Sequence, residues 1–364
     1  MEKITVRFPR LTQEIHVGDG ALSEVVPTLK SLGYDGYLVV IDEGAYRSGK
    51  ERFGNILSEL SIGPERVIRL TPQPHSKDFN TAQKILHRLT TLNATRQSCV
   101  IAIGGGYVGD VVGFAAAIYM RGIHFIQIPT TLMAQGDAII GKVAINFDGK
   151  KNQLGAFYSP RVVFCDTSFL KDFSLEEQAY GLVEIWKHAL LIKDSEIVKR
   201  VERLLDSEDE TTDYADLIAF SLQTKAGFVE HDPEDIKGLH KALSLGHTIA
   251  NLLETKLRFR HGLAVFYGLI FEALLAKHLG KISEEHFHAI VQTAASFERR
   301  FRKLPQVRGF LKKIKLANAL KGDKINSHGT YTFVIPTDDG YELAKDLSAD
   351  TLNQASSLLV TFRI

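Results

Sequence analysis

The pattern of hydrophobic and polar residues divides the chain into two parts of different character. In the first part, short runs of aliphatic and β-branched residues alternate with stretches of helical periodicity. Four of these runs, at residues 37–41, 99–103, 124–129 and 162–165, have the composition of buried strands. Because strands separated by helices usually pair in parallel, we expect an α/β domain with a parallel sheet over residues 1–170.

The second part, residues 171–364, is predicted to be mostly helical. Ser174 and Glu177 have the spacing of a capping box, which predicts the start of a long helix that continues to Ile192. A β-rich run at residues 331–336 interrupts the helical pattern near the C-terminus. We therefore expect an α/β domain followed by a second domain made mainly of helices.

Composition and charge narrow the class of protein. The 364 residues are 45% apolar and 24% charged, as in soluble globular proteins of two domains. A net charge of +1 without a long basic block argues against a nucleic-acid partner. We expect a cytoplasmic protein without a membrane association, because no run of about 20 apolar residues and no signal-peptide core is present. Cys99 and Cys165 lie in apolar runs and predict no disulfide framework.

A glycine-rich turn follows the predicted strand at residues 99–103 and precedes an apolar helical stretch. Glycines in this position build a phosphate cradle, because they allow close backbone approach while the helix presents free N–H groups. An ordinary turn accounts for the same glycines, and their spacing differs from the usual dinucleotide fingerprint. Ligands of parallel sheets bind beyond the carboxyl ends of the strands. The residues at such ends are Asp42, Gly104, Gly105, Gly106, Asp110, Thr130 and Thr131.

Three candidate metal ligands, Glu184, His247 and His261, lie in the helical part of the chain. Glu184 has apolar neighbours in the middle of a predicted helix, where an unpaired carboxylate is costly. One carboxylate and two imidazoles make a three-ligand zinc site with a position left open for substrate. For either histidine taken alone, a hydrogen-bonded or surface residue is the better explanation. His188 is a competing ligand, because it follows Glu184 by four residues and can share its helix face.

Several cationic side chains fall in the same segments. Ordinary surface charge is the alternative explanation for most of them, but Lys187 lies one helical turn after Glu184 in an otherwise apolar stretch. Cations that accompany a metal and a nucleotide predict a substrate that carries phosphate. These cations are Arg121, Lys142, Lys150, Lys151, Lys187, Lys225 and Lys241.

Taken in order, the motifs resemble those of the 3-dehydroquinate synthase family of sugar phosphate cyclases, over roughly residues 37–340. The resemblance rests on eight short blocks that stand in the family's order along the chain. The blocks lie at residues 104–110, 119–122, 129–137, 151–152, 155–158, 181–187, 245–248 and 261–262.

The resemblance implies a Rossmann-like NAD-binding domain, a helical metal-binding domain and a homodimer. It implies that Glu184, His247 and His261 hold Zn²⁺ or Co²⁺. The residues that it implies around NAD are Asp42, Gly104, Gly105, Gly106, Asp110, Thr130, Thr131, Asp137 and Lys151. The residues that it implies around a sugar phosphate are Asp137, Lys142, Lys151, Asn152, Lys187, Lys225, His240 and Arg121, the last reaching the neighbouring subunit.

The reaction that the resemblance implies uses NAD as a recycled catalyst. One substrate hydroxyl is oxidised, phosphate is eliminated beside the resulting ketone, and the ketone is reduced again. The enol pyranose then opens and closes into a carbocycle by an aldol step. The protein is thereby expected to be a carbon–oxygen lyase, most simply of the shikimate pathway of aromatic amino acid biosynthesis.

The chain departs from the family's pattern at positions expected to contact substrate. His240 stands where dehydroquinate synthases have an arginine for the substrate carboxylate, Ser244 replaces an asparagine, and Asn251 replaces a histidine. Leu263 and Ile325 also replace family residues. A histidine is a poor substitute for a bidentate guanidinium. From the resemblance we still expect a dehydroquinate synthase, whose substrate is 3-deoxy-D-arabino-heptulosonate 7-phosphate. The alternatives are a cyclase for another sugar phosphate such as sedoheptulose 7-phosphate, a polyol dehydrogenase, and a non-catalytic NAD-binding homologue.

Overall fold

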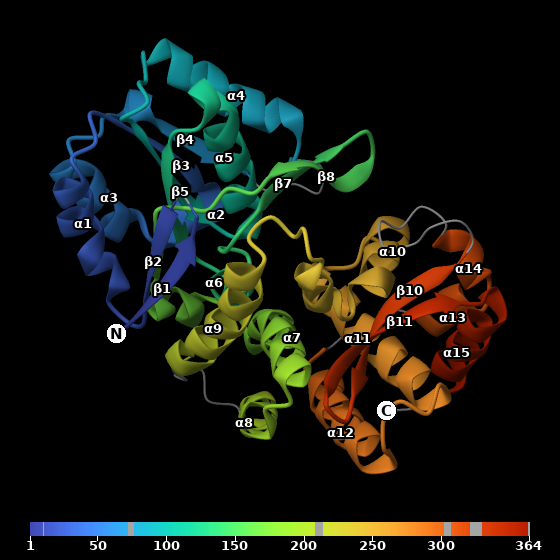
Figure 1. Cartoon of the computed structure of the whole chain (residues 1–364). Coiled ribbons are helices and arrows are strands. Elements are labelled where there is room, and N and C mark those ends of the chain that lie inside the picture. Colours follow the sequence, from blue (N-terminus) through green and yellow to red (C-terminus); the bar gives the residue numbers. More distant parts are fainter. Residues whose placement is uncertain (10, 72–75, 208–213, 302–306, 321–329, 363–364) are drawn as a thin grey trace. The chain divides into compact units, whose positions relative to one another are not determined.

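The chain folds into two compact units, which we describe from a computed structural model (Figure 1). The first unit comprises Met1–Phe173 and Asp213–Ile236, and the second comprises Ser174–Thr212 and Lys237–Ile364. The structure describes residues 1–9, 11–71, 76–207, 214–301, 307–320 and 330–362.

The first unit is built on a seven-stranded sheet in the order β1-β2-β9-β6-β5-β3-β4. Neighbouring strands run parallel except for β1 and β2, which form an antiparallel hairpin. The four predicted strands are confirmed as β3, β5, β6 and β9. The strands β1, β2 and β4 are not among those predicted, because polar residues interrupt their short apolar pattern. The strands are β1 (Glu2–Phe8), β2 (Leu11–Val17), β3 (Tyr37–Asp42), β4 (Val67–Leu70), β5 (Cys99–Gly104), β6 (His124–Pro129) and β9 (Val162–Cys165).

Helices cover both faces of this sheet. Side chains alternate along each strand, so Val39 packs into the core on one face and Leu38 into the core on the other. Burial on both faces explains why the predicted strands are continuous apolar runs. The covering helices are α1 (Val25–Leu32) and α3 (Lys50–Glu59) on one face and α4 (Phe79–Thr91) and α5 (Gly106–Ile118) on the other.

The strand order defines the edge of the sheet where a ligand fits. From β3 the chain moves outward to β4, and then crosses to β5 on the other side of β3 before continuing to β6 and β9. The direction of winding therefore reverses between β3 and β5, and open α/β sheets bind ligands in the crevice beyond such a point. Asp42 ends β3 and Gly104 ends β5.

A separate hairpin, β7 (Val143–Phe147) and β8 (Lys150–Ala156), completes the β-structure of the first unit. Its tip is Asp148 and Gly149, both with positive φ (48° and 71°), which is the geometry of the tight turns that suit a right-handed hairpin. The hairpin therefore exposes the lysines at the start of β8.

The helix α9 (Ala215–His231) belongs to the first unit, although it lies in the part of the chain that we expected to form the second domain. It packs against β1 and against α6 (Leu132–Gly136). The carboxylate of Glu230 accepts a hydrogen bond of 2.6 Å from the backbone N–H of Arg7. This packing brings Lys225 into the first unit.

The second unit is mostly helical. The capping box of Ser174 and Glu177 is present and opens α7. The central helix α11 is buried almost all round, because α7, α10, α12, α15 and β10 pack against it. The long elements are α7 (Leu175–Ile192), α8 (Ser195–Asp206), α10 (His247–Leu257), α11 (His261–His278), α12 (Glu284–Arg300), α15 (Ala349–Thr361), β10 (Tyr331–Thr337) and β11 (Gly340–Leu347).

Short helical segments connect the longer elements of both units. The predicted β-rich run near the C-terminus is confirmed as β10, which pairs with β11. None of the helices in the described part of the chain has both the length and the apolar character needed to span a bilayer. The short segments are η1 (Ala21–Glu24), α2 (Glu43–Ser48), η2 (Pro64–Arg66), η3 (Tyr119–Arg121), η4 (Thr167–Asp172), η5 (Leu239–Ser244), α13 (Val307–Leu311) and α14 (Leu316–Ala319).

Candidate active site

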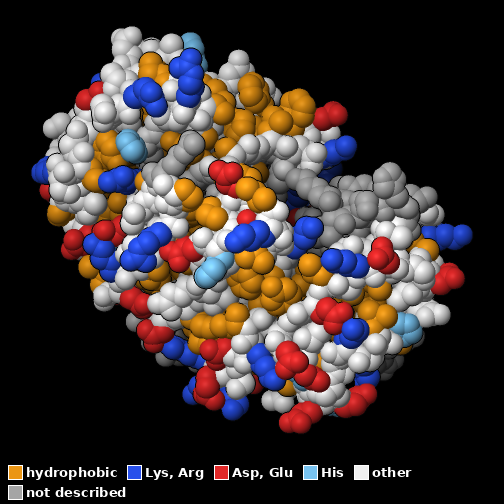
Figure 2. Space-filling view, viewed as in Figure 1, with side chains coloured by type: hydrophobic (Ala, Val, Ile, Leu, Met, Phe, Trp, Pro, Cys, Tyr) orange, Lys and Arg blue, Asp and Glu red, His pale blue; other side chains and the backbone are white. Residues whose placement is uncertain are grey.

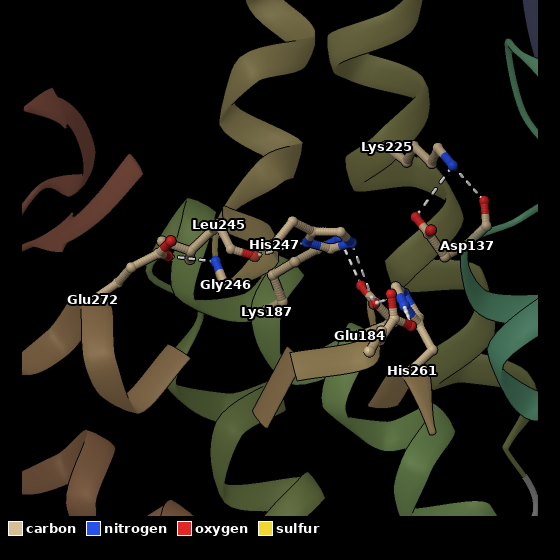
Figure 3. Close-up of polar contacts among 10 residues, drawn as sticks. Asp137, Glu184, Lys187, Lys225, Leu245, Gly246, His247, His261 and Glu272 are labelled. Atoms are coloured by element: carbon tan, nitrogen blue, oxygen red, sulfur yellow. Dashed lines mark hydrogen bonds and ion pairs between the residues drawn. The ribbon is translucent and has the colours of Figure 1, made fainter. Parts of the chain in front are cut away.

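The three predicted metal ligands lie together in the second unit (Figure 3). Glu184 projects from the middle of α7, while His247 and His261 are the first residues of α10 and α11. The Glu184 Oε1 atom lies 3.1 Å from His261 Nε2 and 3.7 Å from His247 Nε2. Ligand atoms about 2.0–2.2 Å from one tetrahedral zinc ion lie about 3.4 Å apart, so the three side chains fit a divalent metal.

The other ring nitrogen of each histidine is anchored. His247 Nδ1 donates to the carbonyl oxygen of Leu245 at 3.0 Å, and His261 Nδ1 donates to the Glu254 carboxylate at 2.8 Å. Because both partners accept the Nδ1–H, the atom left to face Glu184 is Nε2. A protonated ring donates a hydrogen bond to Glu184 from this atom, and a neutral ring has its lone pair there for a metal. Anchoring of this kind orients metal-binding histidines in proteins. Glu254 is a candidate site residue that sequence reasoning missed.

Glu184 is a buried carboxylate with an ammonium partner. Both Glu184 and Lys187 are almost fully buried, and Lys187 Nζ lies 2.6 Å from Glu184 Oε2. Burial alone raises the pKa of the Glu184 carboxyl, but Lys187 and the two histidines outweigh burial and hold this pKa well below its usual value. Glu184 is therefore ionised at neutral pH, as a metal ligand must be.

The two histidines differ in basicity. Burial lowers the pKa of His247 to about 4, despite the attraction of Glu184. Burial acts on His261 in the same direction, but its hydrogen bonds with Glu184 and Glu254 prevail and raise its pKa to about 10. In the absence of metal, His247 is therefore neutral and His261 is protonated at pH 7.

Two glycine contacts position the histidines. A methyl group on Gly262 would lie 2.2 Å from the carbonyl oxygen of Tyr180 on α7. A methyl group on Gly268 would lie 1.8 Å from the carbonyl oxygen of Gly246, the residue before His247. The start of α11 thus lies directly on α7, and the turn that precedes α10 lies directly on α11. Larger residues at either glycine would push a ligand away from Glu184.

The remaining candidates of the second unit lie outside the group of three possible ligands. His188 is buried on α7 and is not among the three side chains whose ligand atoms lie together. His240 is buried on η5. Asn251 is exposed and Leu263 is buried. Residue 325 lies outside the described residues.

The predicted nucleotide edge is assembled at the ends of β3 and β5. A methyl group on Gly104 (φ 150°) would lie 3.0 Å from the Cβ atom of Asp42, so the two strand ends touch. Gly105 is the N-cap of α5, whose first N–H groups follow it. The backbone N–H of Thr130 donates to the carbonyl oxygen of Gly104 at 3.0 Å, and Thr131 caps α6. This edge has the open backbone and the helix N-terminus that bind phosphate.

Asp110 is tied to a lysine that the sequence did not single out. Lys77 Nζ lies 2.7 Å from the Asp110 carboxylate and donates to Asn152 Oδ1, also at 2.7 Å. The backbone N–H of Ala144 donates to the second oxygen of Asp110 at 2.9 Å. Lys77 therefore links α5 to β8. A single lysine in a polar segment carries no local signal for such a role.

Asp137 and Lys225 form the second cluster of predicted residues in the first unit (Figure 3). Lys225 Nζ lies 3.1 Å from the Asp137 carboxylate and also donates to the Asp137 carbonyl oxygen. Lys225 is 8% exposed, and Asp137 is 22% exposed. A largely buried ammonium is thereby held at a carboxylate that solvent reaches.

The other predicted cations are exposed. Lys142 and Lys151 lie at the surface near β7 and β8. Arg121 is exposed on η3, where Met120, Arg121 and Gly122 have consecutive positive φ values of 48°, 67° and 117°. Two adjacent non-glycine residues in this region store strain, a feature typical of functional loops.

A doubly wound sheet with a phosphate-binding edge, together with a helical unit that bears a carboxylate and two histidines, defines a class of dinucleotide- and metal-dependent enzymes. Comparison with known proteins gives the family. The family model described as 3-dehydroquinate synthase N-terminal matches residues 67–180, and the model described as 3-dehydroquinate synthase C-terminal matches residues 181–325. The chain belongs to the 3-dehydroquinate synthase family of sugar phosphate cyclases, which are carbon–oxygen lyases.

Relatives support this assignment along nearly the whole chain. The protein named 3-dehydroquinate synthase from Alkaliphilus metalliredigens (strain QYMF) is 34% identical over 354 residues, which cover 93% of this chain and 94% of the relative. A solved structure of 2-deoxy-scyllo-inosose synthase, complexed with carbaglucose-6-phosphate, NAD+ and Co2+, has a TM-score of 0.83 at 22% identity and covers 98% of this chain and 99% of its own. The 2-epi-5-epi-valiolone synthase ValA from Streptomyces hygroscopicus subsp. jinggangensis 5008, with NAD+ and Zn2+ bound, has a TM-score of 0.79 at 20% identity and covers 99% of both chains.

Proposed function

We propose that this protein is a 3-dehydroquinate synthase, which converts 3-deoxy-D-arabino-heptulosonate 7-phosphate into 3-dehydroquinate and phosphate in the shikimate pathway. The observation that carries the metal-dependent cyclase chemistry is the buried carboxylate of Glu184, shared by Lys187 and two histidines whose outer nitrogens are anchored. The relative from Alkaliphilus metalliredigens, which covers nearly the whole chain, supports the same activity.

We propose that the first unit binds NAD at the edge formed by β3 and β5, and that the second unit binds Zn²⁺ or Co²⁺. When bound, NAD supplies reversible hydride transfer, and the metal supplies Lewis acidity toward a substrate hydroxyl. Asp42 would bind a ribose hydroxyl, and the N–H groups that follow Gly105 would bind the dinucleotide phosphates. Glu184, His247 and His261 would hold the metal.

The cationic side chains would hold the leaving phosphate. Lys225 is fixed by Asp137, and Lys77 fixes Asn152, so the positions of both clusters are set before substrate arrives. Charges that are already positioned stabilise developing negative charge without reorganisation during the reaction. Lys142 and Lys151 would contribute to substrate binding from the surface beside these clusters.

We propose that the enzyme works as a homodimer in the cytoplasm and that Arg121 serves the site of the neighbouring subunit. The strained backbone at Met120 and Arg121 supports this proposal. It places an apolar side chain and a guanidinium next to each other at the surface, where both can contact another subunit. Cys99 and Cys165 are buried as free thiols, which agrees with a reducing compartment.

Subunit complementation tests the role of Arg121. The variants Arg121→Ala and His261→Ala are each expected to be inactive alone. If Arg121 acts on the partner, a mixed dimer has one complete site, and refolding the two variants together restores about a quarter of the wild-type activity. Persistent inactivity of the mixture, with mixed dimers shown by mass spectrometry, would place Arg121 at its own subunit's site.

A second candidate substrate follows from His240. This residue is buried where the family's dehydroquinate synthases have an arginine for the substrate carboxylate, so a sugar phosphate without a carboxylate, such as sedoheptulose 7-phosphate, is the alternative. The structural similarity to cyclases that make other carbocycles agrees with either substrate, because it shows the fold alone.

Phosphate release separates the two substrates. The purified protein, loaded with Zn²⁺ or Co²⁺ and supplied with NAD, is incubated with 3-deoxy-D-arabino-heptulosonate 7-phosphate and with sedoheptulose 7-phosphate in separate assays. Release from the first compound alone supports the proposal. Release from the second compound alone identifies a cyclase of the alternative type. Release from neither compound, with both NAD and metal bound, would contradict both assignments.

A further inference from the structure

The second unit contains a cavity that shares no residue with the metal ligands or with the predicted substrate contacts. Its volume is about 410 Å³, and it lies among α7, α8, α12 and the turn between β10 and β11. Cavities of about 300–1,000 Å³ accommodate small organic ligands. The three helices that surround it pack against one another in the same unit (Figure 1).

The walls of the cavity are apolar stripes on two facing helices. Ala189 and Leu190 line it from α7, and Ala289 and Ile290 line it from α12. Val198 of α8 closes the third side. Ala189 is fully buried in the wall, whereas Ala289 is exposed, so the cavity is open to solvent on the side of α12.

A pair of aromatic rings lies one helical turn further along the same stripes. Trp186 precedes Leu190 by four residues, and Phe297 follows Thr293, another lining residue, by four residues. The centroids of the Trp186 and Phe297 rings lie 5.2 Å apart. Trp186 is the one tryptophan of the whole chain, so its fluorescence reports on this region of the protein.

The rim of the cavity is acidic. Asp194, Glu285 and Asp338 contribute three carboxylates, against a single ammonium from Lys193. Figure 2 shows acidic side chains, with some basic ones among them, over the surface of α8 and α12. An acidic rim around an apolar chamber favours a molecule with a cationic group at one end.

Two carboxylates of the rim are held in place: Asp194 accepts from backbone N–H groups as the N-cap of α8, and Asp338 is held by Ser283. The Ser283 hydroxyl donates to Asp338 at 2.7 Å, the Ser283 backbone N–H donates at 3.1 Å, and His286 Nδ1 lies 3.4 Å away. The hydrogen bonds from Ser283 lower the pKa of Asp338, so its negative charge is maintained at neutral pH.

We propose that this cavity is a second binding site, for a small amine with an aromatic or branched apolar body. The body occupies the cavity beside Ala289, and the ammonium lies at the rim with Asp338. The site is independent of the cyclase activity and of the metal. A carboxylate with the same body binds more weakly, because the same rim repels it.

Titration of Trp186 fluorescence tests the site directly. The probes are phenethylamine and 3-phenylpropionate, which share an apolar body and differ in the sign of their charge. We expect a saturable change with phenethylamine and binding of 3-phenylpropionate that is weaker by about tenfold or more. No saturable change with phenethylamine, or equal binding of the two probes, would overturn the proposal.

Substitutions on one helix locate the binding. Ala289→Phe fills the cavity from an exposed position on α12 and should abolish phenethylamine binding. His288→Phe adds a ring at the neighbouring exposed position, which does not line the cavity, and should leave the titration unchanged. Asp338→Asn should weaken phenethylamine and reduce its advantage over 3-phenylpropionate. Unchanged binding in Ala289→Phe would place the ligand elsewhere and refute the assignment.

Discussion

Gly268 of α11 touches the backbone of Gly246, so closely that a methyl group at position 268 would lie 1.8 Å from the Gly246 carbonyl oxygen. One turn further along α11, the buried carboxylate of Glu272 accepts a hydrogen bond from the Gly246 N–H. His247 follows Gly246 directly, and His261 is the first residue of α11. A single helix therefore sets the positions of both histidines.

The first prediction concerns this contact. Gly268→Ala forces the turn before His247 away from α11, because neither backbone can accommodate the methyl group. We expect the free energy of unfolding to fall by about 3 kcal/mol, as in severe overpacking, and Zn²⁺ affinity to fall by about tenfold. Urea denaturation and competition with a chromophoric chelator measure the two effects.

A glycine in open space provides the control for this substitution. Gly54 lies within α3, and a methyl group there would meet no atom within 4 Å. Gly54→Ala should leave metal affinity unchanged and raise stability by up to about 1 kcal/mol, because alanine has the higher helix propensity. Equal Zn²⁺ affinity of Gly268→Ala and Gly54→Ala would contradict the positioning role of Gly268.

The sequence predicts those features whose cause is local. The helix α7 begins at its capping box and ends at Ile192 as expected, and the four buried strands agree to within a residue, because burial on two faces leaves a continuous apolar run. The candidate metal ligands were recognisable because Glu184 is a charge in an apolar helix. The position of α9 in the first unit could not be predicted, because its packing against β1 depends on residues far away in the sequence.

The partners of the site residues were likewise hidden. Glu254 is recognisable only once α10 and α11 are placed side by side, since it is one acidic residue in an amphipathic helix. Lys77 becomes a partner of Asp110 only when the segment before α4 meets α5. Such residues act through contacts between distant segments, and neither periodicity nor local spacing records those contacts.

The second prediction separates the ligand His261 from its partner Glu254. Glu254→Gln keeps the shape of the side chain but removes the charge that accepts the His261 Nδ1–H. We expect Zn²⁺ affinity to fall by about 10–100-fold, as for other partners of metal-binding histidines. His261→Ala removes a ligand atom and should lower Zn²⁺ affinity further than Glu254→Gln does. Chelator competition gives the order, and a greater loss in Glu254→Gln than in His261→Ala would contradict the assigned roles.

The third prediction concerns Lys187. Replacing it with methionine leaves the Glu184 carboxylate buried without its ammonium partner, and breaking such a pair costs about 3–5 kcal/mol. The loss should be largest in the metal-free protein, because a bound cation compensates the same charge. Thermal unfolding with and without Zn²⁺ measures this difference. An equal loss in the two states would show that no metal binds at Glu184.

The fourth prediction is the pH dependence of metal binding. Without metal, burial opposes protonation of His261, but Glu184 and Glu254 raise its pKa to about 10, whereas the pKa of His247 is about 4. At pH 7 the metal must therefore displace one proton, from His261. We expect Zn²⁺ affinity to rise by about tenfold per unit between pH 6 and 8. Calorimetry in buffers of different ionisation enthalpy should give release of one proton, and a pH-independent affinity would contradict the protonated state of His261.

The last prediction tests the nucleotide edge through Asp42. This residue has two roles, because Oδ1 already accepts the Ala45 N–H at 3.0 Å as the N-cap of α2, and the rest of the carboxylate is proposed to bind a ribose hydroxyl. Asp42→Asn keeps the cap, since asparagine caps helices as well as aspartate, but it removes the charge. We expect NAD affinity to fall by about tenfold while stability changes by less than about 0.5 kcal/mol. Asp42→Ala should show the same loss of NAD affinity and should also lower the free energy of unfolding by about 1 kcal/mol, because the helix cap is lost. If Asp42→Asn binds NAD as the parent protein does, Asp42 is a helix cap alone and the dinucleotide is held by the glycine turn.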